Sequence, residues 1–216
     1  MLIKYLGHSC FYLKSDKGIS VLTDPYKPGA YGGAIAFGPI SEEADIAVIS
    51  HEHEDHFDAK SLPNQPLMVR AACRAMGLEF DVANVWHDDQ CGAKRGPNRI
   101  TCFVMDDIRI CHLGDLGHTL SPEQAKVVGA VDILFLPIGG TYTIGPEEAD
   151  RVIESLQPKI VIPMHFRNEK CGFPMQPAES FLVGKKGIRR ANGSEVIIHQ
   201  EDLPKACTIL YLLPGN

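Results

Sequence analysis

The feature that most constrains this chain is a run of metal-binding residue types directly after an apolar segment. His51-Glu52-His53-Glu54-Asp55-His56 follows Ile46-Ala47-Val48-Ile49-Ser50, which is typical of a buried strand. Neighbouring imidazoles repel one another when protonated, whereas a divalent metal ion binds their lone pairs directly. If the run leaves the strand extended, its first two histidines point to one side and a turn directs its last two residues to a neighbouring position. A solvated surface loop is the alternative, but such a loop would have no reason to follow a fully apolar strand so abruptly. The run therefore predicts two adjacent metal ions.

The spacing H-x-H-x-D-H of residues 51–56 resembles the signature of the metallo-β-lactamase superfamily. Two further segments, Gly7-His8-Ser9-Cys10 and Leu22-Thr23-Asp24-Pro25, resemble the branch of that superfamily that contains ascorbate-6-phosphate lactonase. The resemblance implies an α/β fold of four layers, α/β/β/α, with two sheets face to face and helices outside. Its motifs run from residue 7 to residue 165, so we expect one domain over residues 1–216.

Three later segments supply further candidate metal ligands. His87 ends an apolar stretch before a Gly-rich loop, Asp115 follows a glycine after an apolar strand, and His165 stands at the end of a buried strand. His112 competes with His87, but it lies inside a strand and only three residues before the next motif acid. A carboxylate suits the position of Asp115 because its two oxygens can reach two ions at once.

The resemblance implies how these residues are divided between two metal ions. It assigns His51, His53 and His87 to one ion, Asp55, His56 and His165 to the other, and Asp115 to a bridge between them. Three histidines favour zinc or a similar borderline ion, whereas the position richer in carboxylate accepts zinc, manganese or iron. The superfamily more often has Thr after the bridging Asp. Leu116 stands there in this chain, and we expect it to change the pocket more than the metal ions.

The loops at 25–43, 88–98 and 139–145 are expected to carry the substrate pocket. The candidate substrate-binding residues are Arg95, Asn98, His118 and Tyr142. Arg95 suits an anionic group because guanidinium can bind it in bidentate geometry, although an exposed loop arginine is an equal alternative. His118 is either a pocket residue or an exposed loop residue.

Three polar residues near these motifs have roles that the sequence leaves open. His8 and Asp24 follow predicted strands, and either could accept the ring N–H of a metal-binding histidine. For Asp24 the alternative is a cap for the turn at Asp24-Pro25. Cys171 lies in a loop and could face the site.

Composition limits the classes of partner. A net charge of −6 gives no general attraction to nucleic acid. No apolar run reaches about 18 residues, so no membrane span is expected, and the polar N-terminal segment is not expected to be a secretory signal. Seven cysteines without a C-x-x-C pair indicate free thiols in a reducing compartment. We therefore expect a cytoplasmic protein with a small-molecule substrate, and the sequence leaves a homo-oligomer open.

Hydrophobic periodicity and turn residues predict the following elements. Strands are expected at 2–6, 8–13, 19–23, 67–69, 78–86, 100–105, 107–113, 131–138, 159–164, 195–199 and 206–212. Helices are expected at 58–62, 71–77, 121–129, from 146 onward, and at 177–183. The Gly- and Pro-rich segment 25–43 is expected to be either a flexible flap over the site or surface coil.

Two divalent ions that share a water molecule lower its pKa from nearly 16 towards about 7. We therefore expect a metal-dependent hydrolase that uses metal-bound hydroxide on a small ester, lactone or phosphoester, with Asp55 orienting the nucleophile or moving its proton. A nuclease or phosphodiesterase of the same fold is one alternative, and it would need a basic groove. A redox di-iron protein and a non-catalytic metal-binding protein are the others.

Overall fold

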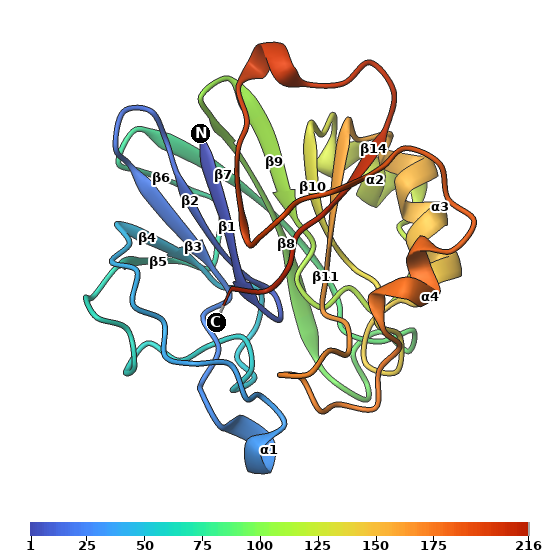
Figure 1. Ribbon diagram of the computed structural model, residues 1–216, viewed down its shortest axis with the longest axis horizontal. Helices are drawn as coiled ribbons and strands as arrows, with labels where there is room; N and C mark the ends of the chain where they lie inside the picture. The colour runs from blue at the N-terminus through green and yellow to red at the C-terminus, as the bar shows by residue number, and fades with distance from the viewer. Residues whose placement is uncertain (216) are drawn as a thin grey trace.

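The computed structural model describes residues 1–215, whose strands form two sheets packed face to face (Figure 1). The first sheet has six strands in the order β13-β1-β2-β3-β4-β5, and the second has eight in the order β12-β14-β11-β10-β9-β8-β7-β6. The six are β1 (Leu2–Gly7), β2 (Cys10–Lys14), β3 (Ser20–Thr23), β4 (Ile46–Val48), β5 (Leu67–Val69) and β13 (Glu195–Ile197). The eight are β6 (Cys73–Ala75), β7 (Leu78–Trp86), β8 (Pro97–Met105), β9 (Ile108–His112), β10 (Ile133–Pro137), β11 (Ile160–Met164), β12 (Ile188–Arg190) and β14 (Thr208–Tyr211).

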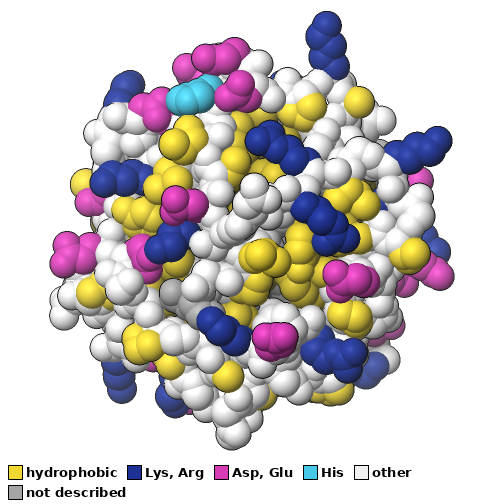
Figure 2. Space-filling model, viewed as in Figure 1, with side chains coloured by type: hydrophobic (Ala, Val, Ile, Leu, Met, Phe, Trp, Pro, Cys, Tyr) yellow, Lys and Arg dark blue, Asp and Glu magenta, His cyan; other side chains and the backbone are white. Residues whose placement is uncertain are grey.

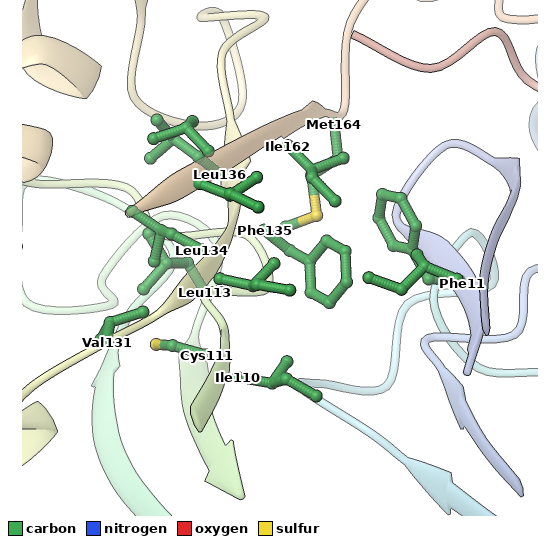
Figure 3. Packing of buried hydrophobic residues seen from close by; sticks show 14 of the residues in the cluster. Phe11, Ile110, Cys111, Leu113, Val131, Leu134, Phe135, Leu136, Ile162 and Met164 are labelled. Atoms are coloured by element: carbon green, nitrogen blue, oxygen red, sulfur yellow. The ribbon is translucent and has the colours of Figure 1, made fainter. Parts of the chain in front are cut away.

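The core lies between the two sheets. In β2 the side chains of Phe11 and Leu13 point into it, while those of Cys10 and Tyr12 point to the outer face, as the two-residue period of a strand requires. Phe11 stacks on Phe135 of β10 with ring centroids 4.1 Å apart, and this contact joins the sheets (Figure 3). β10 and β11 are parallel neighbours and are buried along their whole length, as their continuous apolar sequence predicts.

Three helices, α2 (Pro122–Val128), α3 (Pro146–Leu156) and α4 (Ala178–Leu182), lie on the outer side of the eight-stranded sheet (Figure 1). α3 buries Ala149, Val152 and Leu156, which share one face of the helix. At the start of α2 the backbone N–H of Gln124 donates to the Ser121 hydroxyl, and the backbone N–H of Ser121 donates to the side-chain oxygen of Gln124. This capping box confirms the helix start that the sequence predicts.

The outer face of the six-stranded sheet is covered mainly by the segment that follows β3. Its side chains Tyr26, Phe37 and Ile40 are buried against Leu6 and Leu22 of β1 and β3. Within residues 1–215 this segment holds only one short helix, α1 (Ala30–Gly33). The predicted sandwich of two sheets with helices outside is confirmed. Buried side chains such as Tyr26, Ile35, Phe37 and Ile40 anchor segment 25–43 to the sheet, while about half of its residues are exposed.

Two predicted helices are wrong. Within segment 71–77, residues Cys73–Ala75 form β6, which pairs with β7 across the turn Met76-Gly77. Both turn residues have positive φ, 50° and 83°, which is the geometry of a tight hairpin turn. At 58–62 the Asp58 carboxylate accepts hydrogen bonds from Lys60 N–H and the Ser61 hydroxyl, and these bonds stabilise a turn instead of a helix.

A short 3₁₀ helix, Gln200–Asp202, completes the elements. No helix in the described part of the chain combines the length and the apolar character that a membrane span needs.

Candidate metal centre

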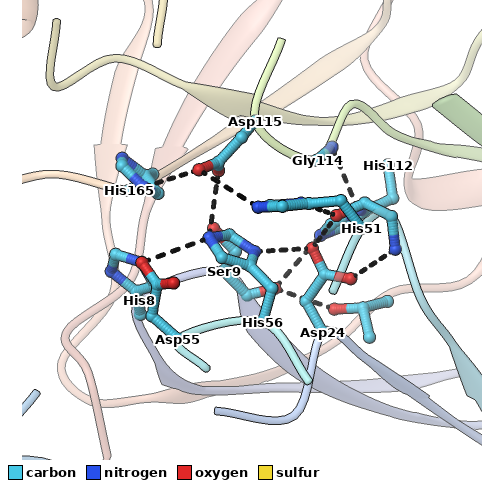
Figure 4. Close-up of polar contacts among 12 residues, drawn as sticks. His8, Ser9, Asp24, His51, Asp55, His56, His112, Gly114, Asp115 and His165 are labelled. Atoms are coloured by element: carbon cyan, nitrogen blue, oxygen red, sulfur yellow. Dashed lines mark hydrogen bonds and ion pairs between the residues drawn. The ribbon is translucent and has the colours of Figure 1, made fainter. Parts of the chain in front are cut away.

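Six strands end at one edge of the sandwich, and the polar side chains that follow them gather in one cluster, of which Figure 4 shows the members other than His53 and His87. These side chains are His8 after β1, Asp24 after β3, residues 51–56 after β4, His87 after β7, Asp115 after β9 and His165 after β11. β3 is parallel to β4, and β9 and β11 are parallel to β10. Carboxyl ends of parallel strands meet at one edge, where α/β proteins bind ligands.

The backbone is strained at three of these positions. His8, Asp24 and His165 have φ of 54°, 38° and 52°, the left-handed region that residues other than glycine rarely adopt. Each such residue costs about 1–3 kcal/mol, and such strain concentrates at functional sites. A backbone hydrogen bond of 3.0 Å from His165 N–H to the His8 carbonyl ties two of them together across the two sheets.

The Asp115 carboxylate is the centre of the cluster. Its Oδ2 lies 3.1 Å from Nε2 of His87 and 3.1 Å from Nε2 of His165, and its Oδ1 lies 3.1 Å from Nε2 of His56. His51 Nε2 is 3.8 Å from Oδ2. One buried carboxylate therefore contacts histidines from both sheets.

The structure brings possible metal ligands together in three groups, and two of them hold most of the predicted ligands. Within each group, one possible ligand atom from each residue lies within 4.8 Å of the others. The first group is His51, His53 and His87, and the second is His8, Asp55, His56 and His165. The third, Asp24, His51 and His56, overlaps both. His112 is in none of them, because its Nε2 bonds to the Ser9 carbonyl and its Nδ1 accepts from Gly114 N–H.

Asp24 holds two of the histidines in orientation. Its Oδ2 accepts the Ser50 hydroxyl at 2.6 Å and His56 Nδ1–H at 2.9 Å, and its Oδ1 accepts Ser50 N–H at 2.7 Å. Since the Ser50 hydroxyl donates to Asp24, its oxygen accepts from His51 Nδ1–H at 2.9 Å. Both rings therefore turn Nε2 towards the cluster, which is the orientation that a carboxylate behind a metal-binding histidine imposes.

His8 acts in the same way on Asp55. Its Nε2–H donates to Asp55 Oδ2 at 3.1 Å, and its Nδ1 faces the Cys171 thiol at 3.8 Å. Burial raises the pKa of that thiol to about 11, so Cys171 stays protonated and can donate to His8. Asp55 Oδ1 is buried and makes no hydrogen bond.

The cluster contains buried polar atoms without hydrogen-bond partners, which a folded protein rarely tolerates. Six of them are His51 Nε2, Asp55 Oδ1, His56 Nε2, His87 Nδ1, Asp115 Oδ1 and His165 Nδ1, of which His56 Nε2 and Asp115 Oδ1 face each other as an ion pair at 3.1 Å. Nitrogen and carboxylate oxygen atoms of this kind are the donors that zinc and related divalent ions take. The residues present therefore fit a metal centre.

The electrostatics of the cluster agree with this fit. Burial lowers the pKa of His51 well below its usual value and that of His8 to about 4, so both rings are neutral and keep a lone pair. Burial opposes protonation of His56 too, but the carboxylates of Asp115 and Asp55 raise its pKa well above the usual value. The two carboxylates thus draw positive charge into the cluster, which a metal ion would supply.

A cavity of about 260 Å³ opens onto this cluster. Its lining residues are Tyr31, His53, Asp55, His87, Arg95, Asp115, Tyr142, His165 and Phe173. Of the predicted substrate-binding residues, Arg95 and Tyr142 are in this lining. Tyr31 and Phe173 were missed, because single aromatic residues in long loops carry no sequence signal for a pocket.

The other two predicted substrate-binding residues lie elsewhere. Asn98 is fully buried, donates to the Leu113 carbonyl at 2.8 Å and accepts from Asp115 N–H at 3.1 Å, so it fixes the turn that carries Asp115. His118 borders a neighbouring groove, where its Nε2 accepts from Trp86 N–H. Neither side chain lines the cavity.

Comparison with known proteins agrees with this geometry. The profile of the beta-lactamase superfamily domain matches residues 2–165. The chain belongs to this superfamily. The resemblance that the motifs indicate is thereby confirmed at superfamily level, while the narrower resemblance to the ascorbate-6-phosphate lactonase branch stays a prediction.

Other members of the superfamily match nearly the whole chain. A UPF0173 metal-dependent hydrolase of Pelotomaculum thermopropionicum is 30% identical over 92% of this chain and 96% of its own length. One from Thermococcus kodakarensis is 28% identical with the same coverage, 92% and 96%. The crystal structure of an inferred Zn-dependent hydrolase of the metallo-β-lactamase superfamily from Thermotoga maritima superposes with a TM-score of 0.79 at 30% identity, covering 98% of this chain and 97% of that one.

Proposed function

We propose that this protein is a metal-dependent hydrolase that holds two divalent ions in the cluster at the strand ends. His51, His53 and His87 would hold one ion, Asp55, His56 and His165 the other, and Asp115 would lie between them. The observation that carries the proposal is that the cluster buries donor atoms without hydrogen-bond partners, His51 Nε2 and Asp55 Oδ1 among them, because their desolvation is unfavourable unless a cation binds them. The names of the UPF0173 relatives support it.

Two divalent ions held by these residues would supply hydroxide at neutral pH, because they would lower the pKa of bound water. The chain's own residues then determine where this chemistry acts. Asp55 lines the cavity and His8 holds its Oδ2, so Asp55 is the residue that would orient the nucleophile or move its proton. The imidazole-rich group favours zinc, and the group with Asp55 accepts zinc, manganese or iron.

A small ester, lactone or phosphoester is the substrate class that fits the cavity. Its volume of about 260 Å³ is below the range of about 300–1,000 Å³ that drug-sized ligands occupy. Arg95 and Tyr142 in its wall are the proposed substrate-binding residues, and the arginine favours an anionic substrate.

A nuclease of the same fold has less support. The chain carries a net charge of −6, and on the face shown in Figure 2 the Lys and Arg side chains are interspersed with Asp and Glu. A non-catalytic metal-binding protein would bind the same ions without turnover, so it is tested by assaying esters, lactones and phosphoesters with the metal-loaded protein. A cytoplasmic location and action as one domain over residues 1–216 stay predictions.

Elemental analysis of the protein purified without added metal tests the two-ion proposal directly. We expect about two equivalents in the natural protein and about one in His165→Ala, because only the second ligand group loses a member. His199→Ala is the matched control, since His199 is half-exposed and lies outside both ligand groups, and it should keep both equivalents. One equivalent or none in the natural protein, unchanged in His165→Ala, would remove the two-ion proposal.

The Asp24→Asn variant tests the support behind the ligands. The amide keeps the volume of the carboxylate, but it cannot accept from His56 and from both Ser50 donors with the same two oxygens. We expect metal affinity to fall by about 10- to 100-fold in a competition titration with a chelator.

The control for this variant is Asp45→Asn. The Asp45 carboxylate accepts hydrogen bonds from the N–H and the hydroxyl of Ser20 at the opposite end of β3. Asp45→Asn therefore changes a similar carboxylate–serine contact that lies away from the cluster. Equal metal affinity in Asp24→Asn and the natural protein would show that Asp24 serves only the fold.

A further inference from the structure

Three aromatic rings form one wall of the cavity. The rings of Tyr31 and Phe173 meet edge to face with centroids 5.4 Å apart, and those of Tyr142 and Phe173 do the same, also at 5.4 Å. They come from three separate segments, the loop after β3, the loop after β10 and the loop after β11. The other lining residues are Arg95 and side chains of the ligand cluster, so the cavity has an apolar wall and a metal-binding wall.

The backbone conformation of Tyr31 supports a role for these aromatic rings in binding a ligand. Tyr31 has φ 52° and ψ 48°, the left-handed region, and it lies between Gly29 and Gly32, which also have positive φ. Its side chain is 50% exposed, so burial of the ring does not compensate the cost of that conformation. The conformation instead places a large ring over the cavity beside Asp55.

Arg95 supplies the only cation among the residues that line the cavity, apart from the histidines. Its guanidinium lies over the Tyr142 ring, 5.3 Å from the centroid, and donates to the Thr141 carbonyl at 3.1 Å. No carboxylate lies within ion-pair distance of it among residues 1–215. A guanidinium fixed in this way keeps donors free for a carboxylate or phosphate group.

The loop that carries Arg95 is built to hold it in place. The Asp88 carboxylate accepts four backbone N–H groups of this loop, those of Gln90, Gly92, Lys94 and Arg95, at 2.8–2.9 Å. The loop therefore presents Arg95 from a fixed backbone instead of a mobile one.

We propose that the substrate is a small hydrolysable compound with an anionic group that binds Arg95 and a flat apolar body that packs against Phe173 and Tyr142. This proposal rests on the proposed function, because it places the bond to be cleaved towards His53, Asp55 and Asp115. A free carboxylate and a phosphate group share the required chemistry. The cavity volume allows about one ring with a few further atoms.

Calorimetric titration of the metal-loaded protein with three probes tests the proposal. Benzoate combines a ring with an anion, benzyl alcohol offers the ring alone and acetate the anion alone. We expect benzoate to bind at least about tenfold more tightly than either of the others. Phenylphosphonate is titrated in parallel. If Arg95→Gln loses more affinity for phenylphosphonate than for benzoate, Arg95 prefers the phosphonate, and if it loses less, Arg95 prefers the carboxylate.

Two variants separate the contributions. Arg95→Gln should lower benzoate affinity about tenfold or more and leave benzyl alcohol nearly unchanged. Phe173→Leu should weaken both aromatic probes and leave acetate nearly unchanged. Arg151→Gln is the matched control, because Arg151 borders the neighbouring groove but not the cavity, and it should leave all probes nearly unchanged. Each variant is compared at equal metal content.

An unchanged benzoate affinity in Arg95→Gln would mean that the anion binds elsewhere, and it would overturn the proposal. Unchanged affinity for both aromatic probes in Phe173→Leu would overturn its aromatic part. The titrations measure binding only, so they are independent of the proposed function. If the protein hydrolyses esters but lacks this binding selectivity, only the inference about the substrate is contradicted. If it binds the probes as expected but hydrolyses no ester, lactone or phosphoester, only the proposed function is contradicted.

Discussion

The Asp115→Asn variant is expected to lose metal and activity together. Asp115 contacts His56, His87 and His165 at 3.1 Å each, so it touches members of both groups of possible ligands and is the proposed shared ligand. The amide has the same shape but no negative charge, and its nitrogen cannot bind a cation. Loss of residues behind metal ligands costs about 10- to 100-fold in affinity or activity, so loss of a shared ligand should exceed about 100-fold in kcat/KM. Elemental analysis should find one equivalent of metal or less.

Asp132→Asn is the matched control for this variant. The Asp132 carboxylate accepts from Arg109 N–H and pairs with Lys159 at 2.8 Å each, so it links strands of the same sheet far from the cluster. This control should lose some stability and keep its metal. Full metal content and activity in Asp115→Asn would exclude a shared carboxylate and, with it, the two-ion arrangement.

The strands that carry the site were predictable because each has a continuous apolar sequence that identifies it without reference to the rest of the chain. The apolar runs before His51, Asp115 and His165 identify buried strands, and a polar residue directly after such a run has to lie at a sheet edge. His87 was preferred to His112 for the same reason, and His112 proves to bond to backbone groups with both ring nitrogens. The strands therefore place these residues at one sheet edge, whereas their division between two metal ions rests on the resemblance to the superfamily.

Contacts between distant segments were not predictable in this way. His8 and Asp24 stayed undecided because a single polar residue after a short strand can equally be a cap, and only the partners Asp55 and His56 distinguish the two roles. Asn98 was expected to bind substrate, but a buried amide that fixes a turn has the same local sequence as one that lines a pocket. The helix expected at 71–77 failed because pairing with β7 outweighs the intrinsic preference of a short segment.

Close approach of two backbones is another feature that the sequence does not reveal, and Gly117 is the clearest case. Its N–H donates to the Trp86 carbonyl at 3.0 Å, and a Cβ built on it would lie 2.3 Å from Asp88 N and 2.3 Å from the carbonyl carbon of His87. Backbone atoms cannot rotate away as a flexible side chain does. Any side chain at 117 must therefore push away the loop that carries His87 and Arg95.

We expect Gly117→Ala to fold with lower stability and to lose metal from the ligand group of His87. Overpacking of this kind costs about 1–3 kcal/mol, which corresponds to a fall of about 2–12 °C in Tm for a chain of this length. Displacement of a ligand should lower metal affinity at least about tenfold, measured by chelator competition. Gly193→Ala is the control, because a Cβ at Gly193 has no neighbour within 4 Å and its φ is not positive, so its Tm and metal content should stay nearly unchanged. If Gly117→Ala matched the control in both measurements, the loop of His87 would be free to move, and the fixed geometry inferred for His87 and Arg95 would not hold.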